Sequence, residues 1–103
     1  MSSLNRKPEP AAPNKATKEL TILNRLGLHA RPSAMFVKTA SRFRTTEVWV
    51  EKDGERVNGK SIMGLMMLAA GQGSKLLISC EGPEAEKALA EIEAVITRKF
   101  DED

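Results

Sequence analysis

The sequence lacks most of the residues that several common kinds of functional site require. Its 103 residues include one cysteine, one histidine, one tryptophan and no tyrosine. The single cysteine, Cys80, excludes an intramolecular disulfide and the clustered cysteines of zinc modules. It lies in the apolar run 76–80 (LLISC), which predicts a buried thiol without a chemical role. Aromatic residues make up only 4% of the chain, so stacking on nucleic-acid bases is not expected.

Long apolar runs and a strong charge of one sign are also missing. No stretch approaches the about 18 apolar residues of a membrane-spanning helix, and the polar, proline-bearing start does not resemble a secretory signal. The net charge of +2 comes from residues 1–17, so the remainder is neutral overall and offers no basic face for nucleic acid. We therefore expect a cytoplasmic protein that does not insert into membranes and does not bind nucleic acids.

The first 17 residues differ in composition from the rest of the chain. They contain three of the five prolines and almost no large apolar side chains. Such a segment cannot bury enough surface to offset the entropy lost on ordering. We predict a disordered extension over residues 1–17 and one folded domain over residues 18–103.

Short strands and helices alternate along the predicted domain. Apolar periodicity and turn residues predict strands over 19–24, 45–52, 55–58 and 75–81, and helices over 30–43, 61–70 and 84–100. Asp53 and Gly54 form a typical hairpin turn between the second and third strands. This βαββαβα order predicts an α+β fold in which all the helices cover one face of a sheet.

The only histidine, His29, lies in the segment 27–32 (GLHARP), where the first predicted strand gives way to the first helix. Free backbone N–H groups and the positive end of the helix dipole would disfavour imidazolium and leave a ring nitrogen free to attack phosphorus. The same N–H groups and the guanidinium fork of Arg31 would then bind the phosphate oxygens. These features would suit a phosphoryl-accepting histidine. A lone histidine near a helix start is more often a surface or capping residue, however, and no acidic residue close in sequence is placed to orient the ring.

The second predicted helix is apolar on nearly every side. Ser61 precedes it as a typical N-cap, and its apolar residues are Ile62, Met63, Leu65, Met66, Met67 and Leu68. Burial of all six is one interpretation, but a short helix on one face of a sheet cannot bury every side. We predict that Ile62, Met63 and Met66 form an exposed apolar patch beside His29, because flexible thioethers suit a surface that accepts several partners in turn.

Residues 54–61 (GERVNGKS) match the GxxxxGKS pattern of phosphate-cradling loops in nucleotide hydrolases. That cradle is one continuous loop between a parallel strand and a helix. Here a hairpin turn and a strand are predicted inside the pattern, and no strand ending in aspartate offers a second magnesium ligand. A nucleotide-binding protein is therefore the less favoured hypothesis.

Three segments together resemble the histidine-containing phosphocarrier protein family, HPr: residues 27–32, residues 57–64 (VNGKSIMG) and residues 82–84 (GPE). The resemblance implies an open-faced β-sandwich of four antiparallel strands with three helices on one face. It also implies that enzyme I of the phosphoenolpyruvate-dependent phosphotransferase system phosphorylates His29 at Nδ1, and that His29 passes the group to an enzyme IIA domain. Arg31 corresponds to the family's phosphate-facing arginine.

The resemblance also concerns regulation and the branch of the family. Ser61 corresponds to the serine that a dedicated kinase phosphorylates in regulated members, which makes an HPr kinase a candidate partner. Leu26 stands where many sugar-system members carry Ser or Asn, and this departure is more usual in the nitrogen-related branch. We predict a monomeric phosphoryl carrier, not a free-standing enzyme, with no cofactor and no metal. A regulatory protein-binding module controlled through Ser61 is the alternative function.

Overall fold

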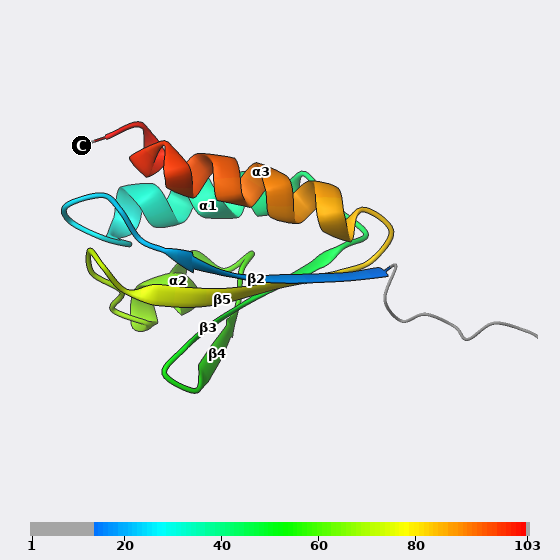
Figure 1. The fold of residues 1–103 in the computed structure, drawn as a ribbon, viewed down its shortest axis with the longest axis horizontal. Helices are drawn as coiled ribbons and strands as arrows, with labels where there is room; N and C mark the ends of the chain where they lie inside the picture. Colours follow the sequence, from blue (N-terminus) through cyan, green and yellow to red (C-terminus); the bar gives the residue numbers. More distant parts are fainter. Residues whose placement is uncertain (1–13, 103) are drawn as a thin grey trace, which may run out of the picture.

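Four strands form one antiparallel sheet in the computed structural model, which describes residues 14–102 (Figure 1). The strands are β2 (Lys15–Thr21), β3 (Glu47–Lys52), β4 (Glu55–Asn58) and β5 (Lys75–Glu81), in the spatial order β2-β5-β3-β4. The helices are α1 (Ala30–Ser41), α2 (Ile62–Met67) and α3 (Ala85–Thr97), and a 3-10 turn, η2 (Lys99–Asp101), follows α3. The predicted α+β class and the βαββαβα order are both confirmed.

The two central strands present one apolar face, as their alternating sequences predict. Val48 pairs with Cys80 and Val50 pairs with Ile78, and all four side chains are buried. Residues between them point to the opposite, open face because successive side chains in a strand alternate. The predicted burial of the Cys80 thiol is confirmed.

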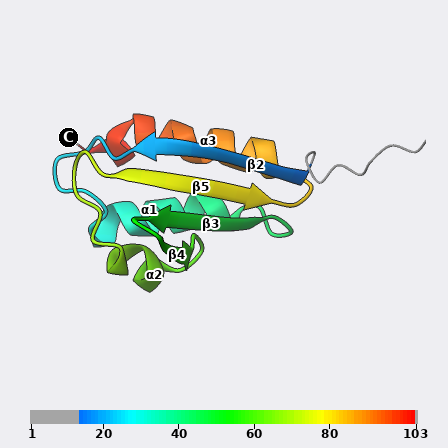
Figure 2. The same cartoon turned by 60° about the horizontal axis from the view of Figure 1, so that its bottom comes forward.

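Helices α1 and α3 lie side by side over the apolar face of the sheet (Figures 1 and 2). Helix α2 packs against α1 and β4, at the β4 edge. Each helix contributes fully buried side chains to a common core: Phe36 from α1, Leu65 from α2 and Ile92 from α3. The core therefore joins all three helices to the sheet and holds the loops at their ends in place.

The nucleotide-loop pattern in residues 54–61 does not form a phosphate cradle. Asp53 and Gly54 adopt left-handed backbone conformations, with φ of 51° and 85°, and close the β3–β4 hairpin. Strand β4 occupies four residues of the pattern, antiparallel to β3. The ammonium group of Lys60, the lysine of the pattern, donates to the carbonyl oxygen of Phe43 at 2.8 Å. The pattern thus arises from a hairpin and a helix cap.

The first strand begins earlier than its composition indicates. Strand β2 starts at Lys15, so the prediction of disorder is wrong for residues 15–17; residues 1–13 lie outside the described part of the chain. Pairing with β5 orders this polar segment, because Lys15 lies opposite Glu81 and their side chains form an ion pair. Lys18 reaches across to Glu93 of α3 at 2.9 Å. The strand also ends at Thr21 instead of continuing to residue 24.

All three helices are shorter than predicted, and α1 ends at Ser41 and not at residue 43. Helix α2 ends at Met67 and not near residue 70, and α3 ends at Thr97 and not at residue 100. Phe100 is buried as predicted but lies outside α3, in a turn whose three residues all have positive φ. Within residues 14–102, no helix has the length and apolar character needed to cross a bilayer.

Candidate functional site

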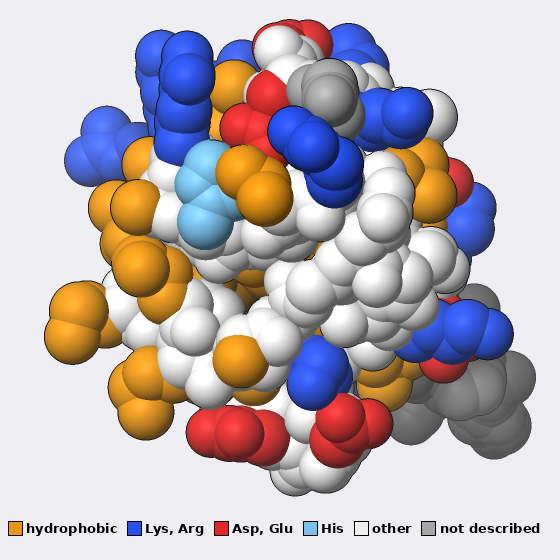
Figure 3. Space-filling view, turned by 90° about the vertical axis from the view of Figure 1, so that its left-hand side faces the viewer, with side chains coloured by type: hydrophobic (Ala, Val, Ile, Leu, Met, Phe, Trp, Pro, Cys, Tyr) orange, Lys and Arg blue, Asp and Glu red, His pale blue; other side chains and the backbone are white. Residues whose placement is uncertain are grey.

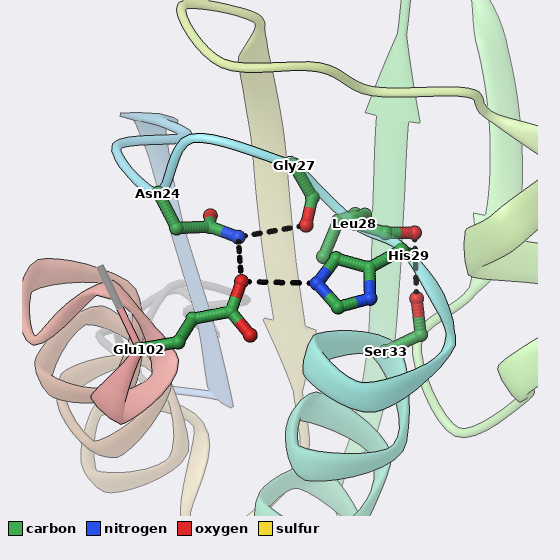
Figure 4. A network of polar contacts seen from close by, with 6 residues as sticks. All are labelled: Asn24, Gly27, Leu28, His29, Ser33 and Glu102. Carbon is green, nitrogen blue, oxygen red and sulfur yellow. Dashed lines mark hydrogen bonds and ion pairs between the residues drawn. The ribbon is translucent and has the colours of Figure 1, made fainter.

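His29 lies where the turn after β2 leads into α1. It is the N-cap residue, with extended backbone dihedrals and no hydrogen bond from its side chain to the helix. Its carbonyl oxygen accepts from the N–H of Ser33 at 3.0 Å, and the Ser33 hydroxyl donates to the carbonyl oxygen of Leu28 at 3.0 Å (Figure 4). The imidazole therefore does not cap the helix, and the His29 side chain is 37% exposed at the positive end of α1.

Backbone contacts fix the turn that precedes His29. Leu28 donates its N–H to the carbonyl oxygen of Ala70 at 2.8 Å, which ties the turn to the segment after α2. Gly27 has φ of 71°, and a Cβ atom there would lie 2.3 Å from the same Ala70 oxygen. Glycine at this position is thus required both by the left-handed backbone and by the close approach of the two segments.

An acidic residue from the end of the chain binds the imidazole. Oε2 of Glu102 lies 2.9 Å from Nε2 of His29, and the same oxygen accepts from Nδ2 of Asn24 at 2.9 Å (Figure 4). Nδ2 of Asn24 also donates to the carbonyl oxygen of Gly27 at 2.8 Å. The hydrogen bond from His29, then that from Asn24, lowers the pKa of the Glu102 carboxyl, and the nearby charge of Arg31 acts in the same direction. Glu102 is therefore a carboxylate near neutral pH.

The other ring nitrogen is left open. Within residues 14–102, Nδ1 of His29 makes no hydrogen bond, and in Figure 4 it lies on the side of the ring away from Glu102. A carboxylate accepts but does not donate, so the Glu102 contact requires a hydrogen on Nε2. Neutral imidazole then carries its lone pair on Nδ1, so this nitrogen is the one able to act as a nucleophile.

Sequence reasoning missed Asn24 and Glu102. They are 78 positions apart in the sequence, and only the folded domain brings them together. The sequence predicts a strand at Asn24, and Glu102 lies beyond the last predicted helix. The amide, which is fully buried, leaves its Oδ1 without a partner in the described part of the chain, so its orientation is determined by the two Nδ2 bonds.

An exposed apolar surface borders His29, and we call it the methionine patch: Ile62, Met63, Met66, Met67 and Leu26. The predicted exposure of Ile62, Met63 and Met66 is observed, and Met63 is the most open at 72%. Leu26 and Met67, at 65% and 66% exposed, were not predicted to belong to it. Figure 3 shows hydrophobic side chains gathered beside the histidine.

A shallow hollow links the methionine patch to the imidazole. Its volume is about 310 Å³, and its lining is mainly apolar: Leu26, Leu28, His29, Met66, Ala69, Ala70 and Gly71. Leu26 therefore adds apolar surface directly next to the ring. A partner that covers the imidazole must also cover this hollow.

Ser61 caps α2, as predicted. Its Oγ accepts from the N–H of Gly64 at 2.9 Å, and the residue is partly exposed. The hydroxyl stabilises the start of a six-residue helix whose outer side carries the methionine patch. Its modification by a kinase stays a prediction.

Comparison with known proteins agrees with this geometry. The family model described as "PTS HPr component phosphorylation site" matches residues 16–98. The phosphocarrier protein HPr of Treponema pallidum (strain Nichols) is 48% identical over 86 residues, which cover 84% of this chain and 97% of the relative. The HPr-like protein Crh of Halalkalibacterium halodurans is 45% identical, over 80% of this chain and 96% of the relative.

Solved structures show the same fold. The crystal structure of HPr-C-His from Thermoanaerobacter tengcongensis superposes with a TM-score of 0.82 at 45% identity, covering 85% of this chain and 98% of that one. The phosphocarrier protein HPr from Bacillus anthracis superposes with a TM-score of 0.76 at 45% identity, covering 80% and 96%. The sheet, the three helices and the matching sequence lead to one conclusion: this chain belongs to the HPr family of phosphocarriers of the phosphotransferase system.

Proposed function

We propose that this protein accepts a phosphoryl group from enzyme I on Nδ1 of His29 and donates it to a histidine of an enzyme IIA protein. The observation that carries this proposal is the state of the ring. Glu102 occupies Nε2 at 2.9 Å, while Nδ1 has no partner within the described residues and lies at the start of α1. A nucleophilic nitrogen is thus presented where helix N–H groups and the helix dipole favour a phosphoryl dianion.

In this proposal the protein is a carrier, and its donor and acceptor proteins complete the transfer site around His29. The methionine patch, which borders His29, is the surface that we assign to both partners in turn; a single small surface that serves two partners favours brief, weak binding.

Arg31 is assigned to the phosphate. It lies in the first turn of α1, two residues after His29, and its residue surface is exposed. Replacement by alanine is expected to slow transfer about tenfold, since two charged hydrogen bonds to phosphate are lost, and to change the unfolding free energy by less than about 0.5 kcal/mol. Rapid-quench measurement of His29 phosphorylation and urea unfolding check the two halves of this prediction.

Two further variants serve as controls for the Arg31→Ala variant. Arg31→Lys keeps the charge but loses the planar fork, so an intermediate rate is expected. Arg56→Ala removes an arginine that stacks on Trp49 at 4.6 Å, on the open face of the sheet, and should transfer at the wild-type rate. Equal rates for Arg31→Ala and Arg56→Ala would remove Arg31 from the mechanism.

The direct test of the proposed function is the intact mass after incubation with phosphoenolpyruvate and enzyme I. We expect one phosphoryl adduct that is lost in acid and survives in base, as a phosphohistidine does. Because the sequence contains one histidine, this lability assigns the adduct to His29. An active enzyme I that leaves the protein unmodified would refute the phosphocarrier proposal.

A regulatory binding module is the second candidate function. It is favoured by the two relatives named HPr-like protein Crh, which are 45% and 47% identical, and by the partly exposed Ser61 hydroxyl at the helix start. A phosphoryl group there would meet the positive end of α2 and would add charge beside the methionine patch without unfolding the helix. This candidate predicts an acid-stable phosphoester on Ser61, so the same mass measurement with a protein kinase distinguishes the two.

A further inference from the structure

Two segments that are far apart in the sequence meet at the imidazole: the turn between β2 and α1, and the residues that follow α3. Asn24 follows β2, His29 precedes α1, and Glu102 lies after η2 near the end of the chain (Figure 4). One carboxylate oxygen, Oε2 of Glu102, receives hydrogen bonds from both Nδ2 of Asn24 and Nε2 of His29. The Asn24 amide thus orients the Glu102 carboxylate, and the carboxylate in turn orients the imidazole.

An unusual turn carries Glu102 to this position. Lys99, Phe100 and Asp101 all have left-handed backbone conformations, with φ of 58°, 55° and 59°. A left-handed conformation costs about 1 kcal/mol for each residue that is not glycine, so surrounding contacts must stabilise this turn. Phe100 supplies one anchor, since it is buried in the core with 3% exposure. The contact of Glu102 with Asn24 and His29 supplies the other.

The carboxylate is also placed to act electrostatically during the proposed phosphoryl transfer. When Nδ1 attacks, its lone pair forms the new N–P bond, and the electron pair of the breaking P–N bond returns to the donor's histidine. No proton needs to move, so the ring of His29 keeps the hydrogen on Nε2 and becomes positively charged. Glu102, 2.9 Å from Nε2, faces that charge directly. On onward transfer the electron pair of the N–P bond returns to Nδ1, and the ring is neutral again.

We propose that Glu102, oriented by Asn24, is a positioning residue that holds His29 in its Nε2–H form, aims Nδ1 at the phosphoryl group and balances the charge of the phosphorylated ring. The part of this inference that concerns transfer rests on the proposed function. The part that concerns the ring does not, because the hydrogen bond exists in the unphosphorylated protein.

The ring is tested first, without any partner. The chain contains one histidine, so labelling with ¹⁵N-histidine gives the signals of His29 alone. In mildly alkaline buffer, wild type should show Nε2 protonated and Nδ1 bare. Glu102→Ala should show a measurable fraction of the Nδ1–H form, whereas Glu102→Gln, whose Oε1 still accepts, should keep the wild-type form.

Transfer is tested second, by rapid-quench phosphorylation with enzyme I. Glu102→Ala is expected to lower the maximal rate about tenfold, the size of effect of one charged hydrogen bond in a partly exposed site. The concentration of enzyme I needed for half-maximal rate should stay the same, because a positioning residue acts on the ring and not on docking. Glu102→Gln restores the hydrogen bond but not the charge, so its rate should lie between the two.

Asp101→Asn is the matched control. Asp101 is the neighbouring carboxylate, is exposed and pairs with Arg98 at 3.0 Å, and asparagine tolerates its left-handed backbone. This variant should reproduce the wild-type ring signals and rate. Ring signals or a maximal rate unchanged in Glu102→Ala would overturn the inference, as would equal loss in Asp101→Asn. If wild type accepts no phosphoryl group, the proposed function fails and the transfer role fails with it, while the ring signals still decide whether Glu102 holds the imidazole.

Discussion

Replacement of His29 by alanine is expected to abolish the acid-labile phosphoryl adduct, with a fall in the rate of phosphorylation by enzyme I of at least about a thousandfold. The loss is total in chemical terms because the variant has no imidazole left to form the N–P bond. The fold should survive, since the His29 side chain makes no capping bond to α1 and is partly exposed. We expect the unfolding free energy to change by less than about 1 kcal/mol. Intact mass and urea unfolding of the same preparation check both statements.

Neither the Cys80 thiol nor the Ser61 hydroxyl is a good substitute acceptor for an acid-labile phosphoryl group. The Cys80 thiol is fully buried, and burial raises its pKa to about 11, so its thiolate is scarce at neutral pH. Phosphorylation of Ser61 would give an ester that survives in acid, which the same measurement distinguishes. An acid-labile adduct that persists in His29→Ala would place the acceptor elsewhere and contradict the assignment.

Gly27→Ala is expected to be the most destabilising small substitution at the site. A Cβ atom would lie 2.3 Å from the carbonyl oxygen of Ala70 and 2.7 Å from Cα of Gly71, and both are backbone atoms that cannot rotate away. The position also has φ of 71°, which alanine adopts only at a cost. We expect a loss of about 3 kcal/mol or more in unfolding free energy, measured by urea denaturation.

The same substitution should also disturb the ring of His29. The 2.8 Å bond from Leu28 N–H to Ala70, and the bond from Asn24 to the Gly27 carbonyl oxygen, both depend on this close approach. Gly71→Ala is the matched control, because a Cβ atom there meets nothing within 4 Å and its φ is not in the left-handed region. That variant should change stability by less than about 0.5 kcal/mol. Equal unfolding midpoints for the two variants would show that the turn does not need glycine.

Local features of the sequence predicted much of the fold. The alternation around Val48 and Val50, the Asp53-Gly54 turn and the apolar run before Cys80 each describe a strand or turn within a few residues, and the structure agrees. Ser61 was identified as a helix cap for the same reason: a cap depends on the residue and the three that follow it. The position of His29 at a helix start also followed from its immediate neighbours.

Features that depend on pairing between distant segments were not predictable in this way. Residues 15–17 have the composition of a polar tail, yet β5 supplies their backbone partners and Glu81 pairs with the charge of Lys15. The apolar spacing of α3 continues to Phe100 and therefore predicts a helix to residue 100, whereas α3 ends at Thr97. The burial of Phe100 was predicted correctly, but the backbone reaches the core by a left-handed turn.

By itself, then, the sequence determined that the chain has a single histidine, that it lies at the start of the first helix, and that the second helix has exposed apolar residues. Only the tertiary structure decided how the imidazole is held. Glu102 and Asn24 lie 73 and 5 positions from His29, and neither spacing follows a helical or strand period that would place them at its ring. Their meeting requires the whole core to be assembled: Phe100 buried, α3 packed on the sheet, and the Gly27 turn seated on Ala70. A hydrogen bond between such segments forms only because the fold has already brought them together.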